Sequence, residues 1–206
     1  MATSSSLSRL ERVFRQVIQD LGDLHRRWAL VGALAVSART QPRFTRDIDL
    51  AIAVRGDDDA ESLVRQLQAR QYRVHGIVEQ EATRRLATAR FLTGGEDESG
   101  VVLDALFASS GIEPEVVEEA EVFEVLPNLR VPVATLAHLI ALKVLAMDDR
   151  TRPQDRVDVT ALLAEAGPRD ISDVREAVAL IAQRGFHRGK DLAAELDKLL
   201  EARETR

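Results

Sequence analysis

The sequence contains no cysteine and only one tryptophan and one tyrosine, with six prolines among 206 residues. The lack of cysteine excludes disulfide bonds and thiolate metal sites. No run of about 18 apolar residues occurs, and no cationic start precedes an apolar segment, so we expect neither a membrane span nor a secretory signal. These absences together favour a cytoplasmic protein.

The chain also lacks an excess of positive charge, because its formal net charge is −6. This argues weakly against a protein that coats long nucleic acids, since such binding neutralises many phosphates. Residues 111–126 contain six glutamates and no basic residue, which we interpret as the solvated face of a short helix. Basic residues gather before residue 47 and again over residues 143–156, which is compatible with a local pocket for a triphosphate or an RNA end.

Hydrophobic residues make up 45% of the chain, which is enough to build a sizeable core. We expect one compact α+β unit with two lobes. Apolar residues recur at helical spacing over residues 7–21, 63–67, 136–147, 174–182 and 187–201. Short strands are expected over residues 71–75 and 122–125, whereas residues 77–85 stay ambiguous.

Residues 28–54 form the stretch around which the rest is organised. Asp47 and Asp49 lie two apart in an apolar run, so on a strand both carboxylates leave one face roughly 7 Å apart. The two carboxylates repel each other unless a cation joins them. Aspartate is also a poor strand former, and such a conflict between residue type and strand is expected mainly at functional sites. The alternative is an edge strand whose aspartates face water and discourage edge-to-edge pairing.

The upstream half of this stretch favours a phosphate site. A probable strand ends at Gly32, which allows a close backbone approach, and residues 33–39 read as a helix whose first N–H groups can hold a phosphate. The pattern Arg43-x-Thr45-x-Asp47-Ile-Asp49 follows directly. A Gly-Ala turn alone is a weak signal, but the two features in one short segment make a stronger one.

Asp104 is the natural third carboxylate. It interrupts the apolar strand expected over residues 101–107, where burial without a partner would be costly. A turn-rich segment, residues 94–100, joins this strand to the one before it as a hairpin. The alternative is a structural aspartate satisfied by an arginine, with Arg90 across the hairpin as the candidate.

The second half of the chain is helical after Thr135, a good helix cap. Lys143 lies close to the apolar stripe of its helix, either because its ammonium group reaches water or because it binds phosphate. Asp155 and Asp158 lie three apart on one helix face. Acids near Pro153 at a helix start are also ordinary capping residues, so both interpretations stay open.

These motifs resemble the nucleotidyltransferase fold of the DNA polymerase β superfamily, and within it the minimal AbiEii-like proteins found in toxin–antitoxin pairs. The resemblance lies in Gly32-Ala33, in Arg43-x-Thr45-x-Asp47-Ile-Asp49, and in Lys143-x-x-Ala-x-x-x-Arg followed by Asp155-x-x-Asp158. Family members usually carry Gly-Gly or Gly-Ser where this chain has Gly32-Ala33, and Ala33 cannot supply a hydroxyl to a phosphate.

The resemblance implies a mixed β-sheet flanked by helices, followed by a C-terminal helical lobe, with a core over residues 1–131 and the lobe over residues 132–206. It also implies a catalytic triad that holds two Mg²⁺ ions, with the third carboxylate a candidate proton acceptor. Gly32, Ala33, Arg43, Thr45 and Lys143 would bind the nucleotide, and Asp155 or Asp158 would help shape the site. The triad is Asp47, Asp49 and Asp104.

The activity implied is transfer of a nucleoside monophosphate from a nucleoside triphosphate to an acceptor hydroxyl. The expected partners are that triphosphate, an acceptor such as tRNA or a protein, and a cognate antitoxin, with no membrane. Two alternatives are a non-catalytic nucleotide- or partner-binding module of the same fold and an antibiotic adenylyltransferase. The acceptor does not follow from the residues.

Overall fold

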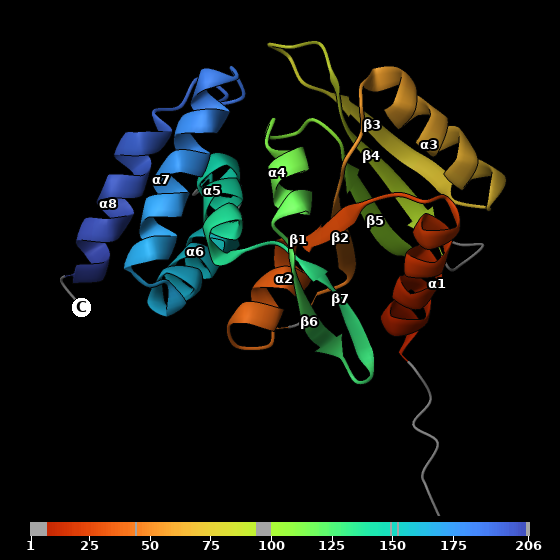
Figure 1. Cartoon of the computed structure of the whole chain (residues 1–206), viewed down its shortest axis with the longest axis horizontal. Helices are drawn as coiled ribbons and strands as arrows, with labels where there is room; N and C mark the ends of the chain where they lie inside the picture. Colours follow the sequence, from red (N-terminus) through yellow and green to blue (C-terminus); the bar gives the residue numbers. More distant parts are fainter. Residues whose placement is uncertain (1–7, 44, 94–99, 149, 152, 205–206) are drawn as a thin grey trace, which may run out of the picture.

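A seven-stranded mixed sheet forms the centre of the molecule (Figure 1). The computed structural model describes residues 8–43, 45–93, 100–148, 150–151 and 153–204. The strand order is β3-β4-β5-β2-β1-β7-β6. The strands are β1 (Trp28–Val31), β2 (Asp47–Ile52), β3 (Arg73–Glu79), β4 (Leu86–Thr93), β5 (Val101–Leu106), β6 (Glu121–Leu126) and β7 (Leu129–Val133).

Two of the strand pairs are parallel, β2 with β5 and β1 with β7, and the other neighbouring pairs are antiparallel. This arrangement confirms the expected mixed sheet. The strand expected over residues 71–75 is in fact β3, which begins later and extends over the first residues of the segment that the sequence left ambiguous, whereas residues 80–85 form no strand. The expected turn at residues 94–99 lies outside the described residues.

The strand that carries Asp47 and Asp49 lies inside the sheet, between β5 and β1. The edge-strand interpretation is therefore wrong. Ile48 and Leu50 are fully buried, because the alternate face of β2 packs into the core. Protection of an exposed sheet edge therefore does not explain the two aspartates.

Helices cover the sheet, with α1 and α3 at one end of the view and α5 to α8 at the other (Figure 1). The expected helix over residues 7–21 corresponds to α1, with Leu7 outside the described residues. Phe14 of α1 packs edge-to-face on Trp28 of β1 at 6.4 Å between ring centroids. The first four helices are α1 (Arg9–Asp23), α2 (Gly32–Arg39), α3 (Asp57–Ala69) and α4 (Glu113–Glu118).

The remaining helices follow the sheet without interruption by a strand among the described residues (Figure 1). Thr135 caps α5 by accepting a hydrogen bond from the backbone N–H of His138 at 3.2 Å, as expected. Across the described part of the chain, none of the helices has the length and apolar character needed to cross a membrane. They are α5 (Leu136–Ala146), α6 (Pro153–Glu165), α7 (Pro168–Gln183) and α8 (Leu192–Glu204).

The last helix starts later than its apolar spacing predicted, at Leu192 and not at His187. Arg188 and Gly189 adopt left-handed backbone conformations with φ of 55° and 72°, which a helix cannot accommodate. The Asp191 carboxylate then accepts a hydrogen bond from the Ala194 N–H at 3.0 Å and starts the helix. Residues 187–191 are thus a loop between α7 and α8.

A buried polar cluster ties α1 to the segment after α3. Asp20 accepts hydrogen bonds from the Tyr72 hydroxyl at 2.7 Å and from the Arg70 guanidinium at 2.6 Å. Burial alone would raise the pKa of Asp20, but the hydrogen bonds from Tyr72, Arg70 and Gln16 outweigh it and hold the pKa below 3.8. The stability that Asp20 contributes is therefore present above about pH 4 and lost as the pH falls through the lowered pKa.

We expect Asp20→Asn to lower the free energy of unfolding at pH 7 by about 1–3 kcal/mol, because it weakens charge-assisted hydrogen bonds in a buried place. Urea denaturation at pH 7 and at pH 3 measures this, and the difference from wild type should shrink at pH 3. Asp23→Asn is the matched control, since Asp23 meets the same arginine at 3.3 Å from an exposed position. Equal losses in the two variants would contradict a special role for Asp20.

Candidate functional site

The predicted carboxylates form a row across the sheet. Asp49 of β2 lies opposite Asp104 of β5, and Asp104 lies opposite Arg90 of β4. On its other side Asp49 lies opposite Val31, the last residue of β1. Directly opposed residues on neighbouring strands have Cβ atoms about 5 Å apart on one face. The parallel β2–β5 pair thus joins residues that are distant in sequence.

Gly32 follows Val31 and lies against this row. A Cβ atom at position 32 would lie 2.0 Å from Oδ2 of Asp49, and its φ of 64° is left-handed. Only glycine allows both the close approach and this conformation without strain. Since Gly32 is also the first residue of α2, the helix begins beside the Asp49 carboxylate.

A cleft of about 1140 Å³ opens above this row, between the sheet and the helical lobe. Its lining combines seven of the predicted site residues: Gly32, Ala33, Asp47, Asp49, Asp104, Lys143 and Asp155. Of the predicted residues that the structure describes, Arg43, Thr45 and Asp158 do not line it. The cleft thus collects both ends of the predicted site.

The predicted residues outside the cleft are linked to its lining by short contacts. Thr45 accepts a hydrogen bond from the backbone N–H of Asp47 at 3.3 Å, which fixes the start of β2. Arg43 is placed by a hydrogen bond from its own backbone N–H to the Ser37 hydroxyl at 3.2 Å. These two residues support the site from its rim.

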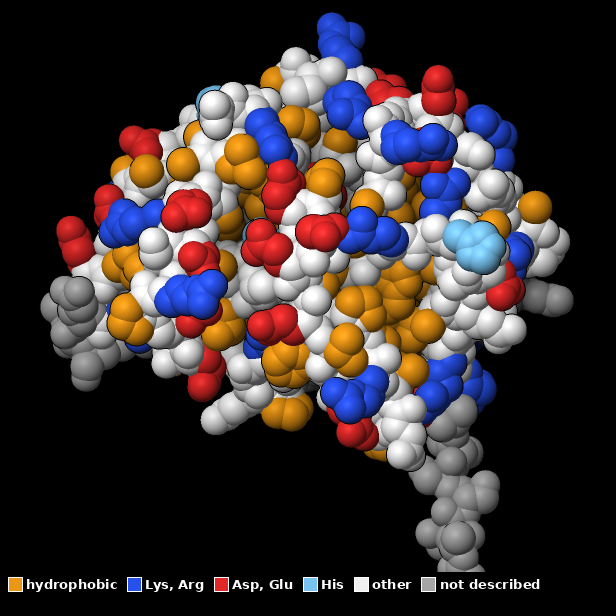
Figure 2. Space-filling model, in the orientation of Figure 1, with side chains coloured by type: hydrophobic (Ala, Val, Ile, Leu, Met, Phe, Trp, Pro, Cys, Tyr) orange, Lys and Arg blue, Asp and Glu red, His pale blue; other side chains and the backbone are white. Residues whose placement is uncertain are grey.

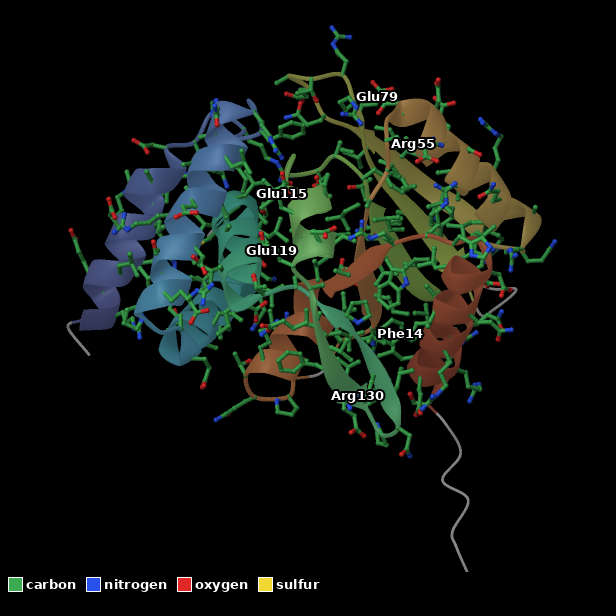
Figure 3. The ribbon with its side chains drawn as sticks, viewed as in Figure 1. Phe14, Arg55, Glu79, Glu115, Glu119 and Arg130 are labelled. Atoms are coloured by element: carbon green, nitrogen blue, oxygen red, sulfur yellow. The ribbon has the colours of Figure 1, made fainter. Side chains whose placement is uncertain are left out.

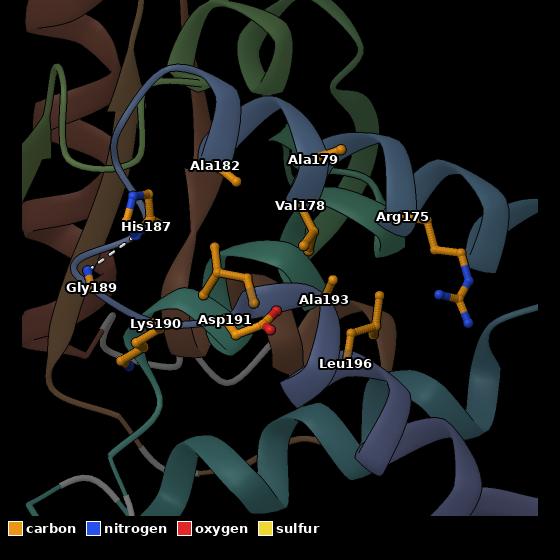
Figure 4. A pocket seen from close by; sticks show the side chains of 11 residues that line it. Arg175, Val178, Ala179, Ala182, His187, Gly189, Lys190, Asp191, Ala193 and Leu196 are labelled. Atoms are coloured by element: carbon orange, nitrogen blue, oxygen red, sulfur yellow. Dashed lines mark hydrogen bonds between the residues drawn. The ribbon is translucent and has the colours of Figure 1, made fainter.

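A second cavity of about 560 Å³ lies between α7 and α8 (Figure 4). Its walls are mostly apolar, with His187, Lys190 and Asp191 at one end and Arg175 at the other. It contains none of the predicted site residues. The larger cleft is therefore the candidate active site.

Asp104 is held by an arginine. Arg90 donates from Nε to Oδ1 of Asp104 at 2.8 Å and from a terminal nitrogen to Oδ2 at 2.6 Å. These hydrogen bonds raise the pKa of Arg90, burial opposes the rise, and the charges of Asp104, Asp47 and Asp49 add to it. The sequence left open whether Asp104 is a metal ligand or a partner of Arg90, and its carboxylate is paired with Arg90 in this structure.

The fit to a divalent cation differs among the three carboxylates. Asp47 is exposed and Asp49 half-buried in the cleft, and Mg²⁺ binds through one or two carboxylates together with substrate phosphates. In the described ranges no three His, Asp or Glu side chains come together as a metal site. Asp47 and Asp49 thus suit one ion that a triphosphate also contacts, whereas Asp104 is engaged elsewhere.

Lys143 joins α5 to α6 through two ion pairs. Its ammonium group lies 2.7 Å from Oδ1 of Asp155 and 2.8 Å from Oδ2 of Asp158. Asp158 also pairs with Arg43 at 2.8 Å. Burial would raise the pKa of Asp158, but the hydrogen bonds and charges of Lys143 and Arg43 lower it. Lys143 thus reaches the acids of the next helix, so reaching water does not explain its place.

Asp155 and Asp158 are buried, at 7% and 2% exposure. A residue that only caps a helix start usually stays in water, so simple capping does not explain them. Through Arg43 and Lys143 they connect the segment before β2 to the helical lobe. This network closes one end of the cleft.

Comparison with known families decides the assignment. Residues 16–206 match the family described as "Nucleotidyl transferase AbiEii toxin, Type IV TA system". The chain belongs to this AbiEii nucleotidyltransferase family. No curated protein matches the sequence.

Solved structures agree with the AbiEii assignment at the level of the fold. An antigenic nucleotidyltransferase-like protein from Paracoccidioides brasiliensis is 17% identical, with a TM-score of 0.51 and 92% of each chain covered. The antibiotic-resistance factor ANT(2″)-Ia is 16% identical, with a TM-score of 0.48, over 95% of this chain and 91% of its own. The first likeness shows a shared fold, and identities this low do not transfer a substrate.

For this AbiEii protein we expect Lys143→Met to lower the free energy of unfolding by about 3 kcal/mol, because removal of one partner leaves buried carboxylates insufficiently compensated. Urea denaturation measures the loss. The matched control is Lys198→Met, which removes an exposed ion pair to Glu195 on α8 and should cost less than about 1 kcal/mol. Similar small losses in both variants would show that the ion pairs of Lys143 do not hold α5 to α6.

The sequence did not reveal two basic residues of the AbiEii cleft, Arg188 and Lys190. Arg188 donates to the carbonyl and hydroxyl oxygens of Ser109, both at 3.1 Å. Lys190 donates to the carbonyls of Leu145 and Met147 at 2.8 and 2.6 Å, and burial lowers its pKa. Apolar spacing assigned both to a helix, although the flanking glycines of a basic segment were a signal for a loop.

Glu113 was also missed, because the acidic segment was interpreted as solvated. That is wrong for Glu113, which is 1% exposed and accepts hydrogen bonds from the Ser110 N–H, the Ser110 hydroxyl and the Gly111 N–H at 2.7, 2.9 and 3.0 Å. It fixes the loop that carries Ser109 and Ser110 into the cleft. The spacing Ser-x-x-Glu, as in a capping box, was the available signal.

Other glutamates of the acidic segment form ion pairs with distant arginines. Glu115 pairs with Arg184 at 2.6 Å, and Glu118 pairs with Arg27. Glu115 and Glu119 mark the α4 helix in Figure 3, where it lies between the sheet and the helical lobe. The segment therefore helps to join the two parts of the molecule.

Proposed function

We propose that the chain catalyses Mg²⁺-dependent transfer of a nucleoside monophosphate from a nucleoside triphosphate to an acceptor hydroxyl. The acceptor oxygen forms a bond to the α-phosphorus, the bond from that phosphorus to the α,β-bridging oxygen breaks, and pyrophosphate leaves with the electron pair. The hydroxyl proton passes to solvent. The observation that carries the proposal is the contact between Gly32, at the start of α2, and the Asp49 carboxylate in one cleft.

Asp47 and Asp49 are the residues suited to hold Mg²⁺. When bound, the ion would neutralise phosphate charge and make the α-phosphorus easier to attack. The first N–H groups of α2, at Gly32 and Ala33, would bind the phosphates. Lys143 lines the helical side of the cleft, where its ammonium group is held by Asp155 and Asp158 and would face the bound triphosphate.

Positioning and charge neutralisation therefore supply most of the rate enhancement in this proposal. Two Mg²⁺ ions are expected from the superfamily. The pairing of Asp104 with Arg90 favours one ion at Asp47 and Asp49 as the minimum requirement.

We further propose a biological role as the toxin of a toxin–antitoxin pair, acting in the cytoplasm on a tRNA or a protein. The description of the matching family supports the toxin role. On the face shown in Figure 2, basic and acidic side chains both occur, and no broad surface of basic side chains alone covers it. This face therefore offers no extended track for a long nucleic acid, and we propose that the acceptor enters the cleft by its reactive end.

The proposal is tested by incubation of the protein with Mg²⁺, each α-³²P-labelled nucleoside triphosphate, and either total RNA or cell lysate. We expect label in one macromolecular fraction from the preferred triphosphate, and none when EDTA removes the metal. Absence of label from both fractions with all four triphosphates would contradict the proposal. Thermal unfolding with Mg²⁺ and each triphosphate serves as a parallel measure of binding.

A further inference from the structure

Arg90 is the positive side chain that stands in register with Asp104 and Asp49 on the sheet side of the cleft. Arg90 lies opposite Asp104 in the β4–β5 register, and Asp104 lies opposite Asp49 in the β5–β2 register. The bidentate pair with Asp104 fixes the plane of the guanidinium. Arg90 is therefore part of the same row as the metal-binding carboxylates and is positioned by one of them.

The guanidinium is also accessible from the cleft. The Arg90 side chain is 47% exposed, whereas that of Asp104 is 11% exposed. The bidentate pair uses two of the five N–H donors of a guanidinium. The other donors are placed at the cleft wall, where a phosphate oxygen would accept from them.

Charge counting at this row points to a single ion. Asp49 and Asp104 of the row, Asp47 two residues before Asp49 on β2, and Arg90 together carry a net charge of −2, which one divalent cation offsets for these four side chains. A second ion on Asp104 would lie beside the Arg90 guanidinium, and the two positive charges would repel each other. The described residues also offer no third His, Asp or Glu to complete a metal site with Asp47 and Asp49.

We propose that Arg90, held in place by Asp104, supplies the second positive charge of the active site, so that one divalent cation on Asp47 and Asp49 suffices. This inference rests on the proposed function and departs from the two-ion expectation for the superfamily. Arg90 contacts the triphosphate and is a catalytic residue. Asp104 acts through Arg90 and is a positioning residue that does not bind metal.

The number of bound ions tests the inference without turnover. Mn²⁺ replaces Mg²⁺ as a paramagnetic probe, and an α,β-methylene triphosphate analogue prevents transfer. Equilibrium dialysis with electron paramagnetic resonance then counts Mn²⁺ per protein–nucleotide complex. We expect one Mn²⁺ per complex in the wild-type protein and in Asp104→Asn, with nucleotide affinity at least tenfold weaker in Asp104→Asn.

Arg90 variants complete the test. We expect Arg90→Met to bind the analogue at least tenfold more weakly with one Mn²⁺, and Arg90→Lys to be intermediate, because lysine keeps the charge and loses the planar fork. If unpaired Asp104 unfolds Arg90→Met, the double variant Arg90→Met/Asp104→Asn gives the same measurement. The matched control is Arg130→Met. Arg130 lies on β7 opposite Glu124 of β6, away from the cleft (Figure 3).

Two Mn²⁺ ions per wild-type complex, falling to one in Asp104→Asn, would overturn the inference. Tighter metal binding by Arg90→Met would overturn it as well, because Arg90 would then only compete with the metal for Asp104. Failure of the proposed function is a separate result. Label transfer that proceeds with two bound ions would keep the function and refute the inference, whereas one bound ion with Arg90-dependent nucleotide binding and no transfer would do the reverse.

Discussion

Asp49→Asn is expected to reduce nucleotidyl transfer about 1000-fold or more while the protein remains folded. The substitution removes a negative charge that the Mg²⁺ ion needs, and an amide oxygen is a much weaker ligand for such a hard cation. Stability should stay equal or rise, because Asp49 lies in a row with Asp104 and on the same strand as Asp47, where the like charges repel without a cation. Loss of activity with retained stability is characteristic of a site residue.

Initial rates of label transfer and urea denaturation of the same preparations measure the two effects. Asp58→Asn is the matched control, because Asp58 is an exposed acid in the first turn of α3, outside the cleft. It should transfer label at the wild-type rate and lose less than about 1 kcal/mol of stability. A large loss of stability in Asp49→Asn would show that Asp49 serves the fold.

Gly32→Ala is expected to have the second-largest effect, although it adds only one methyl group. The new Cβ would lie 2.0 Å from the Asp49 carboxylate, so that carboxylate or the start of α2 must move. The left-handed φ of 64° adds strain of about 1–2 kcal/mol for a residue with a Cβ. We expect a stability loss of about 2 kcal/mol or more and a transfer rate at least tenfold lower, since a displacement of about 1 Å at such a site can cost about 100-fold.

Gly22→Ala provides the control for this substitution. Gly22 lies in α1, and an added Cβ there meets nothing within 4 Å. Alanine should therefore leave activity unchanged and raise stability by up to about 1 kcal/mol, through its higher helix propensity. Wild-type activity in Gly32→Ala would contradict the close packing of the helix start on Asp49.

The central stretch of the site could be predicted because its signals are local. The spacing of Asp47 and Asp49 depends only on the two-residue period of a strand, and Gly32 marks a turn by its lack of a side chain. The candidate partner of Asp104 was also accessible, since Arg90 and Asp104 belong to one predicted hairpin. The two-residue period of a strand thus predicted the carboxylates. The short-range hairpin pairing predicted one of the two possible roles of Asp104, that of a partner for Arg90.

Long-range packing could not be predicted. The parallel β2–β5 pair sets Asp49 opposite Asp104, and sequence spacing carries no information about this register. Lys143 was equally compatible with water and with phosphate, because its pairing with Asp155 and Asp158 depends on how α6 packs on α5. Each of these contacts is fixed by the arrangement of elements that are separate in the sequence.

The loops on the cleft were misjudged for a different reason. Apolar spacing extended a helix across Arg188 and Lys190, and the density of charge suggested that Glu113 faces water. Both patterns are averages over a segment, whereas the outcome depended on single residues, Gly189 with its left-handed φ and Glu113 with its hydrogen bonds to a loop. Segment averages predict elements better than they predict the connections that complete a site.

The most direct test of the proposed activity follows both ends of one triphosphate, labelled on the α-phosphate in one reaction and on the γ-phosphate in another. We predict that the acceptor fraction retains α label and no γ label, that the γ label appears in pyrophosphate, and that both events require Mg²⁺ and Asp49. An acceptor that carries γ label, or equal α labelling by the wild-type protein and Asp49→Asn, would contradict nucleotidyl transfer at this cleft.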